Sequence, residues 1–243
     1  MKISVVIPVL NERASLPATV EALRACRGLS EIIISDGGST DGTADWVRAQ
    51  PDLILVNSAR GKGPQLNAGA ARTTGDVLLF LHADSTMSQA ALGAMQSALS
   101  EISTLNVARR QLAGGAFYIR FAESRPRSLR LVASGINIRA RFRNSATGDQ
   151  GIFVRKSVFE SIGGAPEWPL FEDVELVRRI KQAGNFTVLR TPLTVSGRRY
   201  IEHGVFRTAL LIYSLRLAYW LGVPPQRLKN WFSDARTDQK SRD

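Results

Sequence analysis

Short apolar runs alternate with amphipathic segments along the first hundred residues. Continuous apolar runs rich in β-branched residues, typical of strands covered on both faces, occur at 3–9, 31–35, 53–57 and 76–83. Helical spacing of apolar residues follows each run, at 15–26, 43–50, 64–73 and 88–100, with Ser15 as the expected N-cap of the first helix. This alternation with short connections predicts βαβ units and a mostly parallel sheet.

The pattern changes after residue 110. The expected elements are a strand at 114–121, a strand and short helix at 151–164, a helix at 171–184 that ends at Gly184, and a strand at 186–190. Two further segments are predicted to be helical. Residues 122–146 are basic and partly helical, and residues 204–233 form a helical segment that Pro224 and Pro225 divide. The polar tail from Ser233 is expected to fray.

The composition is that of a globular α/β protein. The chain has 243 residues, 44% hydrophobic and 22% charged, and its single cysteine, Cys26, excludes an intramolecular disulfide. No run of about 18 apolar residues is present, so no membrane span is predicted. The sequence therefore favours a cytoplasmic protein.

The formal net charge of +11 indicates which kinds of partner the protein can attract. Nine arginines stand between positions 109 and 143 against a single acidic residue, Glu123: Arg109, Arg110, Arg120, Arg125, Arg127, Arg130, Arg139, Arg141 and Arg143. Such a field suits nucleic acid, an anionic membrane surface or a phosphate-bearing substrate, although a solvated basic face explains it equally well.

Polar residues follow three of the predicted strands. Asn11 and Glu12 follow the first, Asp36 to Asp41 the second, and Asp84 the fourth. Ligands of parallel α/β sheets bind beyond the carboxyl ends of the strands, so these residues indicate a binding crevice. Asp36, followed by Gly37 and Gly38, can accept hydrogen bonds from a base or ribose, or can close a tight turn.

Two other segments offer charged groups to such a crevice. In "LLFLHADSTM" (78–87), His82 and Asp84 can hold a divalent cation that bridges to a diphosphate, although His82 can also bond to backbone. Arg60 and Lys62, just before a helix start, can make an anion site or can be ordinary solvated cations.

Carboxylates also gather in "FEDVEL" (171–176). Glu172 and Asp173 lie at the start of a predicted helix, where the helix dipole favours negative charge. A carboxylate at this place can equally serve as a general base that takes a proton from an attacking hydroxyl.

Five motifs in order carry a family resemblance: "VVIPVLNE", "SDGGSTDGT", "NAGAARTTGDVLLFLHADS", "IFVRKSVFESIGG" and "FEDVELVRRIKQAG". Together they resemble the family-2 nucleotide-sugar glycosyltransferases of the GT-A fold, over roughly residues 2 to 190. The resemblance implies an α/β fold with a mostly parallel sheet flanked by helices. It also implies a transferase domain at 1–203, with a nucleotide-binding half at 1–100 and an acceptor half at 101–203. A C-terminal helical extension at 204–243 would pack on that domain.

The resemblance implies roles for several of the site residues. It implies that the sugar nucleotide, with UDP expected, would contact Val9, Glu12, Asp36 and Asp84. Beside these we expect contacts from Pro8, Gly38, Arg60, Lys62 and Arg199. Asp84 and His82 would hold Mn²⁺ or Mg²⁺. Asp173 would be the base of an inverting transfer to a hydroxyl acceptor, with Glu172 positioning it.

The sequence departs from the family pattern at two places. Gly37 replaces a second Asp after strand two, and His82 replaces the first Asp of the metal-binding Asp-x-Asp, which favours Mn²⁺ over Mg²⁺. The Gln-x-x-Arg-Trp motif of processive members is absent, and Arg198, Arg199, His203 and Arg207 stand in that region, able to close over a diphosphate.

Other functions remain open at this point. A nucleotidyltransferase would need a Gly-rich loop with Arg and Lys near position 10, where "PVLNERAS" stands. A nucleic-acid-binding protein would explain the charge, but no recognised module for nucleic acid is present. A sugar-nucleotide-binding protein without activity is the third alternative. The helical stretch 205–223 can pack on the core, line an acceptor pocket, form a homodimer contact or rest on a membrane surface.

Overall fold

The computed structural model describes residues 1–104, 111–123 and 125–231. The predicted tail from Ser233, and Arg109 and Arg110 of the basic stretch, lie outside the described residues. The strands are β1 (Ile3–Val9), β2 (Glu31–Asp36), β3 (Leu53–Asn57), β4 (Val77–Phe80), β5 (Ser85–Thr86), β6 (Leu112–Phe121), β7 (Ile152–Arg155) and β8 (Asn185–Val195). The helices are α1 (Leu16–Arg24), α2 (Thr43–Arg48), α3 (Lys62–Ala71), α4 (Gln89–Thr104), α5 (Ser128–Arg143), α6 (Lys156–Ser161), α7 (Glu172–Ala183), α8 (Arg198–Glu202) and α9 (Val205–Trp220), with a 3₁₀ turn at Gly148–Gln150.

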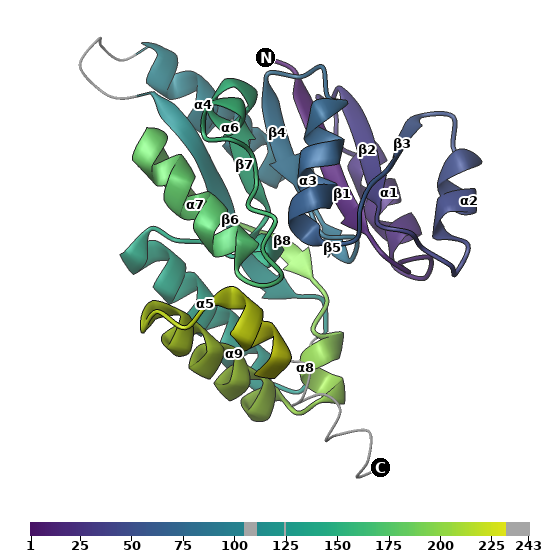
Figure 1. Ribbon diagram of the computed structural model, residues 1–243. Coiled ribbons are helices and arrows are strands. Elements are labelled where there is room, and N and C mark those ends of the chain that lie inside the picture. The colour runs from purple at the N-terminus through teal and green to yellow at the C-terminus, as the bar shows by residue number, and fades with distance from the viewer. Residues whose placement is uncertain (105–110, 124, 232–243) are drawn as a thin grey trace.

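The described strands form one eight-stranded sheet in the order β3-β2-β1-β4-β7-β6-β8-β5 (Figure 1). The βαβ units of the first half make β3, β2, β1 and β4 mutually parallel. β7 runs antiparallel to both of its neighbours, and β6 is parallel to β8. The sheet is therefore mostly parallel, as the sequence predicts, and the carboxyl ends of β1, β2 and β4 share one edge.

Helices cover both faces of the sheet because its strands bury both sets of alternate side chains. Val5 and Ile7 of β1 belong to a core with residues of α1, α2, α4 and α5. Val6, on the opposite face, belongs to a core with residues of α3, α6 and α7. The small residues of α3 allow it to lie close to the sheet, since a Cβ at Gly69 would come within 2.4 Å of Val6 Cγ1.

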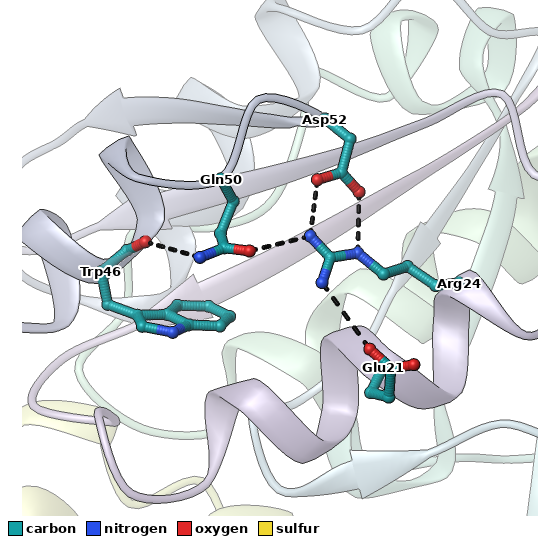
Figure 2. Close-up of polar contacts among 5 residues, drawn as sticks. All are labelled: Glu21, Arg24, Trp46, Gln50 and Asp52. Atoms are coloured by element: carbon teal, nitrogen blue, oxygen red, sulfur yellow. Dashed lines mark hydrogen bonds and ion pairs between the residues drawn. The ribbon is translucent and has the colours of Figure 1, made fainter.

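An arginine ties the end of α1 to the turn before β3. The Arg24 guanidinium donates to both carboxylate oxygens of Asp52, at 2.9 and 2.5 Å, and to Gln50 Oε1 at 3.0 Å (Figure 2). Gln50 Nε2 in turn donates to the Trp46 carbonyl at 3.4 Å. These contacts hold α1 and α2 against the edge of the sheet that lies farthest from the second half of the chain.

Several expected boundaries need correction. β4 ends at Phe80 rather than at Ala83, so His82 and Asp84 lie in a turn that leads into the short β5. β8 runs to Val195, five residues beyond the expected end, because its second half pairs with both β6 and β5. Ser15 precedes α1 but makes no side-chain cap, since its hydroxyl donates to Glu12 Oε2 at 2.5 Å. The α8 turn was not predicted.

The C-terminal helices lie together at one end of the molecule. Figure 1 shows α5, α8 and α9 gathered there, below the sheet. As predicted, the helical segment is interrupted near Pro224 and Pro225, because α9 ends at Trp220 and helix resumes at 225–231. Leu215 of α9 and Leu228 pack against Phe171. None of the described helices is both long enough and apolar enough to cross a membrane.

Candidate active site

A cavity of about 490 Å³ lies where the two halves of the chain meet. Pro8 and Glu12 line it from the β1 edge, and His82 and Asp84 from the turn after β4. The second half contributes the start of α7, the 3₁₀ turn before β7, and faces of α5, α8 and α9. Eight of the predicted site residues therefore meet in one place: Pro8, Glu12, Lys62, His82, Asp84, Glu172, Asp173 and Arg199.

Lys62 connects the predicted metal residues with the predicted catalytic pair. Its Nζ lies 3.2 Å from His82 Nε2 and 4.0 Å from Glu172 Oε1. Because an ammonium can only donate, His82 Nε2 accepts this hydrogen bond and the ring proton sits on Nδ1. Burial, together with the Lys62 and Arg199 cations, lowers the pKa of His82 well below its usual range. The imidazole is therefore neutral at pH 7, the form that ligates metals.

The backbone holds the Asp173 carboxylate in place. Oδ2 accepts a hydrogen bond from the Gly148 N–H at 2.6 Å, and Oδ1 accepts one from the Val174 N–H at 2.7 Å. Each carboxylate oxygen can accept a second hydrogen bond. A fixed carboxylate with free acceptor capacity, facing a cavity, is what a general base requires.

Glu172, its neighbour, is buried, with only 6% of its surface exposed. Burial and the adjacent Asp173 carboxylate raise its pKa from 4.5 to about 7, against the opposing attraction of Lys62. The residue before the pair, Phe171, has a left-handed backbone with φ of 63°. Packing of its ring on Tyr219, with centroids 5.0 Å apart, holds this uncommon conformation and so fixes the start of α7.

A carboxylate close to Glu172 and Asp173 was not among the predicted site residues. Asp149 lines the cavity from the 3₁₀ turn, where burial raises its pKa and the Asp173 carboxylate adds to the effect, against a hydrogen bond from Thr147. Tyr200 lines the same space, and its pKa is raised to about 12, chiefly by burial and then by Asp149. The sequence did contain a signal, because Thr147 and Gln150 have the spacing of a capping box and form one around this turn.

Four predicted donor residues do not line the cavity. Val9 is buried, and its carbonyl accepts from Gln65 Nε2 at 2.6 Å. Asp36 is 4% exposed and closes the tight turn that was the alternative interpretation, since its carboxylate accepts the Gly38 N–H at 3.1 Å and the Ser39 N–H at 3.0 Å. Gly38 and Arg60 are exposed and lie outside the cavity lining.

The described residues include no group of three or more His, Cys, Asp or Glu side chains that could hold a metal by themselves. His82 and Asp84 nevertheless supply a neutral imidazole and a carboxylate to the same cavity. Mg²⁺-type sites commonly take one or two protein ligands and complete their shell with phosphates and waters. The donor set therefore fits a cation that a diphosphate helps to bind.

Comparison with known proteins identifies the family. The sequence profile of glycosyl transferase family 2 matches residues 4–163, about two thirds of the chain. The chain belongs to this family. An undecaprenyl-phosphate 4-deoxy-4-formamido-L-arabinose transferase of Serratia proteamaculans is 42% identical over 94 residues. That match covers 34% of this chain and 29% of the relative.

Solved structures of other glycosyltransferases show the same fold. A mannosyltransferase from Pyrobaculum calidifontis, in complex with GDP-Man and Mn²⁺, has a TM-score of 0.63 at 21% identity, with 94% of this chain and 67% of that chain covered. A glucosyl-3-phosphoglycerate synthase from Mycobacterium tuberculosis, in complex with Mn²⁺, UDP-glucose and phosphoglyceric acid, has a TM-score of 0.56 at 19% identity, with 92% and 80% covered. This family-2 chain therefore has the predicted GT-A fold.

Proposed function

We propose that this chain transfers a sugar from a nucleoside-diphosphate donor to a hydroxyl acceptor. One observation carries the proposal: Asp84 and Asp173, the expected donor and acceptor carboxylates of this family, line the same cavity from opposite halves of the chain. UDP is the expected nucleotide, although among the similar structures one holds UDP-glucose and another GDP-Man.

On the donor side, the diphosphate would lie between Asp84 and the cations at the cavity, Lys62 and Arg199. His82 and Asp84 would hold a divalent cation, which would supply charge neutralisation for the departing diphosphate. Lys62, now donating to His82, is also placed to donate to a phosphate oxygen, so donor binding would exchange one partner of this ammonium for another.

On the acceptor side, Asp173 would accept the hydroxyl proton as the new glycosidic bond forms. Its two backbone hydrogen bonds keep the carboxylate oriented during this step. Glu172 would act as a positioning residue through its contact with Lys62. Attack from the side opposite to the departing nucleotide would invert the sugar centre.

Donor binding is the direct test of this proposal. Calorimetry should detect UDP binding that requires Mn²⁺ or Mg²⁺, and Asp84→Asn should weaken it by about tenfold or more, because one carboxylate ligand is lost. Asp45→Asn, at an exposed carboxylate of α2, is the matched control and should leave binding unchanged. If no nucleoside diphosphate binds with either cation present, the proposal is wrong.

We also propose that the enzyme works at the surface of an anionic membrane. Exposed apolar residues form a stripe at helical spacing along α9: Phe206, Leu210, Tyr213, Leu217 and Trp220. A second stripe lies on α5: Leu131, Ile138 and Phe142. The two stripes adjoin, because the Arg143 guanidinium at the end of α5 lies 6.0 Å from the Trp220 ring centroid.

The charge around these stripes favours lipid over a second copy of the chain. Residues 125–148 and 203–231 contain no Asp or Glu and carry seven exposed arginines and one exposed lysine, while their other two arginines, Arg139 and Arg216, line the cavity. Pairing of this face with itself would bring like charges together, whereas an anionic headgroup layer complements them. A homodimer through this face is therefore the less favoured alternative.

A further inference from the structure

One buried cation in the cavity has no partner among the residues that the structure describes. Arg216, on α9, is 8% exposed and lines the cavity. Within the part of the chain that the structure describes, its side chain makes no hydrogen bond, ion pair or ring contact. Six carboxylates line the same cavity, and none of them forms an ion pair with Arg216: Glu12, Asp84, Asp149, Glu172, Asp173 and Glu202.

A guanidinium remains charged at any physiological pH, so Arg216 cannot escape the cost of burial by losing its proton. Buried charges in folded proteins are almost always paired, because an isolated charge loses its hydration without compensation. A buried arginine that faces a cavity, and that has no partner within the described part of the chain, is therefore a site prepared for an incoming anion.

A second arginine in the cavity is also incompletely satisfied. Arg139 of α5 donates through one terminal nitrogen to Gln150 Oε1 at 3.0 Å and to Thr147 Oγ1 at 3.3 Å. Its Nε is buried without a hydrogen-bond partner. These contacts hold the Arg139 side chain in place through one terminal nitrogen. Its other terminal nitrogen makes no hydrogen bond to the described residues and so keeps donor capacity for a ligand.

The position of Arg216 assigns it to the acceptor side. The preceding residue, Leu215, packs on Phe171, which leads directly into Glu172 and Asp173. The donor residues His82 and Asp84 come instead from the turn after β4, in the other half of the chain. An anion at Arg216 would thus belong to the molecule that Asp173 serves.

We infer that Arg216, supported by Arg139, binds a phosphate group of the acceptor. This inference rests on the proposed transferase function and specifies the substrate class. The planar guanidinium fork matches two phosphate oxygens, and such charge-assisted pairs are strongest where water is excluded. The phosphate belongs to one of two kinds of acceptor. In a soluble phosphorylated alcohol, a hydroxyl would attack the sugar and give its proton to Asp173. In an isoprenoid lipid of the membrane on which α5 and α9 would rest, a phosphate oxygen would itself attack the sugar as the nucleoside diphosphate leaves.

The test is phosphate binding to the full-length protein in the presence of saturating UDP and Mn²⁺, so that the donor site is already filled. Calorimetric titrations would use inorganic phosphate, glycerol 3-phosphate and a short-chain isoprenyl phosphate. Arg216→Met should weaken binding of each by about tenfold or more, because it removes the charge and the N–H donors of the guanidinium. Arg216→Lys should recover part of the affinity, because it restores the charge without the fork.

Arg72→Met is the matched control, because it removes the same charge from an exposed position after α3, outside the cavity lining. Binding that falls equally in the two variants, or that is unchanged in Arg216→Met, overturns the inference, as does wild-type protein that binds none of the three probes. If Arg216→Met does not fold, Arg139→Met takes its place and must weaken the same binding.

The probes also separate the two sources of phosphate. Tighter binding of isoprenyl phosphate than of glycerol 3-phosphate indicates a lipid acceptor, and the reverse indicates a soluble one. If the proposed function is wrong, UDP itself does not bind, which is a different result from loss of phosphate binding. Phosphate titration of the protein without UDP would then still test Arg216.

Discussion

Glu172→Gln should change how the stability of this protein depends on pH. The wild-type carboxyl has its pKa raised from 4.5 to about 7 in the folded state, by burial first and by Asp173 second. Between these two values the folded protein retains a proton that the unfolded chain has released. The free energy of unfolding therefore decreases as the pH rises through this window, and levels off above it.

The size of the effect follows from the shift. A difference of about 2.5 units between 4.5 and about 7 corresponds to about 3 kcal/mol, at 1.36 kcal/mol per unit. This is an upper figure, because Glu172 and Asp173 lie side by side and share part of the titration. Glutamine at position 172 does not titrate. As the pH rises from about 4.5 to about 7, the free energy of unfolding of the variant should therefore increase relative to that of the wild type, by up to this amount.

Urea denaturation followed by circular dichroism, at a series of pH values across this window, measures the difference. The wild-type and Glu172→Gln curves should diverge with increasing pH. The matched control is Glu21→Gln on α1, whose side chain is 77% exposed, and its curve should stay parallel to the wild type. If the free energies of unfolding of Glu172→Gln and the wild type also change in parallel with pH, ionisation of the buried Glu172 carboxyl does not destabilise the fold as predicted.

Three further predictions concern the catalytic reaction and the membrane. Asp173→Asn should lower kcat by about a hundredfold or more with little change in nucleotide affinity, and near-wild-type turnover would remove Asp173 from the role of base. His82→Asp should improve Mg²⁺-supported activity relative to Mn²⁺, because a carboxylate suits the harder ion, whereas equal support of the wild type by both ions would argue against His82 as a ligand. Leu217→Glu should weaken sedimentation with phosphatidylglycerol vesicles by about tenfold, while Ala59→Glu, in the loop after β3, should not. Equal vesicle binding by both variants, or loss of a dimer in Leu217→Glu, would reject the membrane contact.

The first half of the fold was predictable because its strands are buried on both faces. In β1, β2 and β4 nearly every position is buried, so the apolar run and the strand almost coincide. β8 was predicted too short because its residues are mostly half-buried, and its second half is stabilised by pairing with strands far away in the sequence. Local periodicity carries no information about such partners.

The candidate site was predictable only in part, for a related reason. Motifs indicated Asp84 and Asp173, but Asp149 reaches Asp173 through a turn that lies more than twenty positions earlier in the chain. The spacing of Arg207 and Arg216, nine positions or two and a half helical turns, places them on opposite faces of α9. Which face is buried depends on the packing of Leu215 against Phe171, and that contact cannot be read from the helix alone.

The two-residue strand β5 limits how the two halves of such an enzyme can be exchanged between relatives. Ser85 and Thr86, immediately after Asp84, pair with Val195 and Thr194 at the end of β8. The segment that would bind the donor and the segment that leads into Arg198 and Arg199 are thus hydrogen-bonded to one another. Exchange of the second half between relatives, with a crossover near residue 100, would break this ladder unless β5 and β8 were matched. New acceptor specificities are therefore expected to arise by substitution within α5 and α9 rather than by recombination of whole halves.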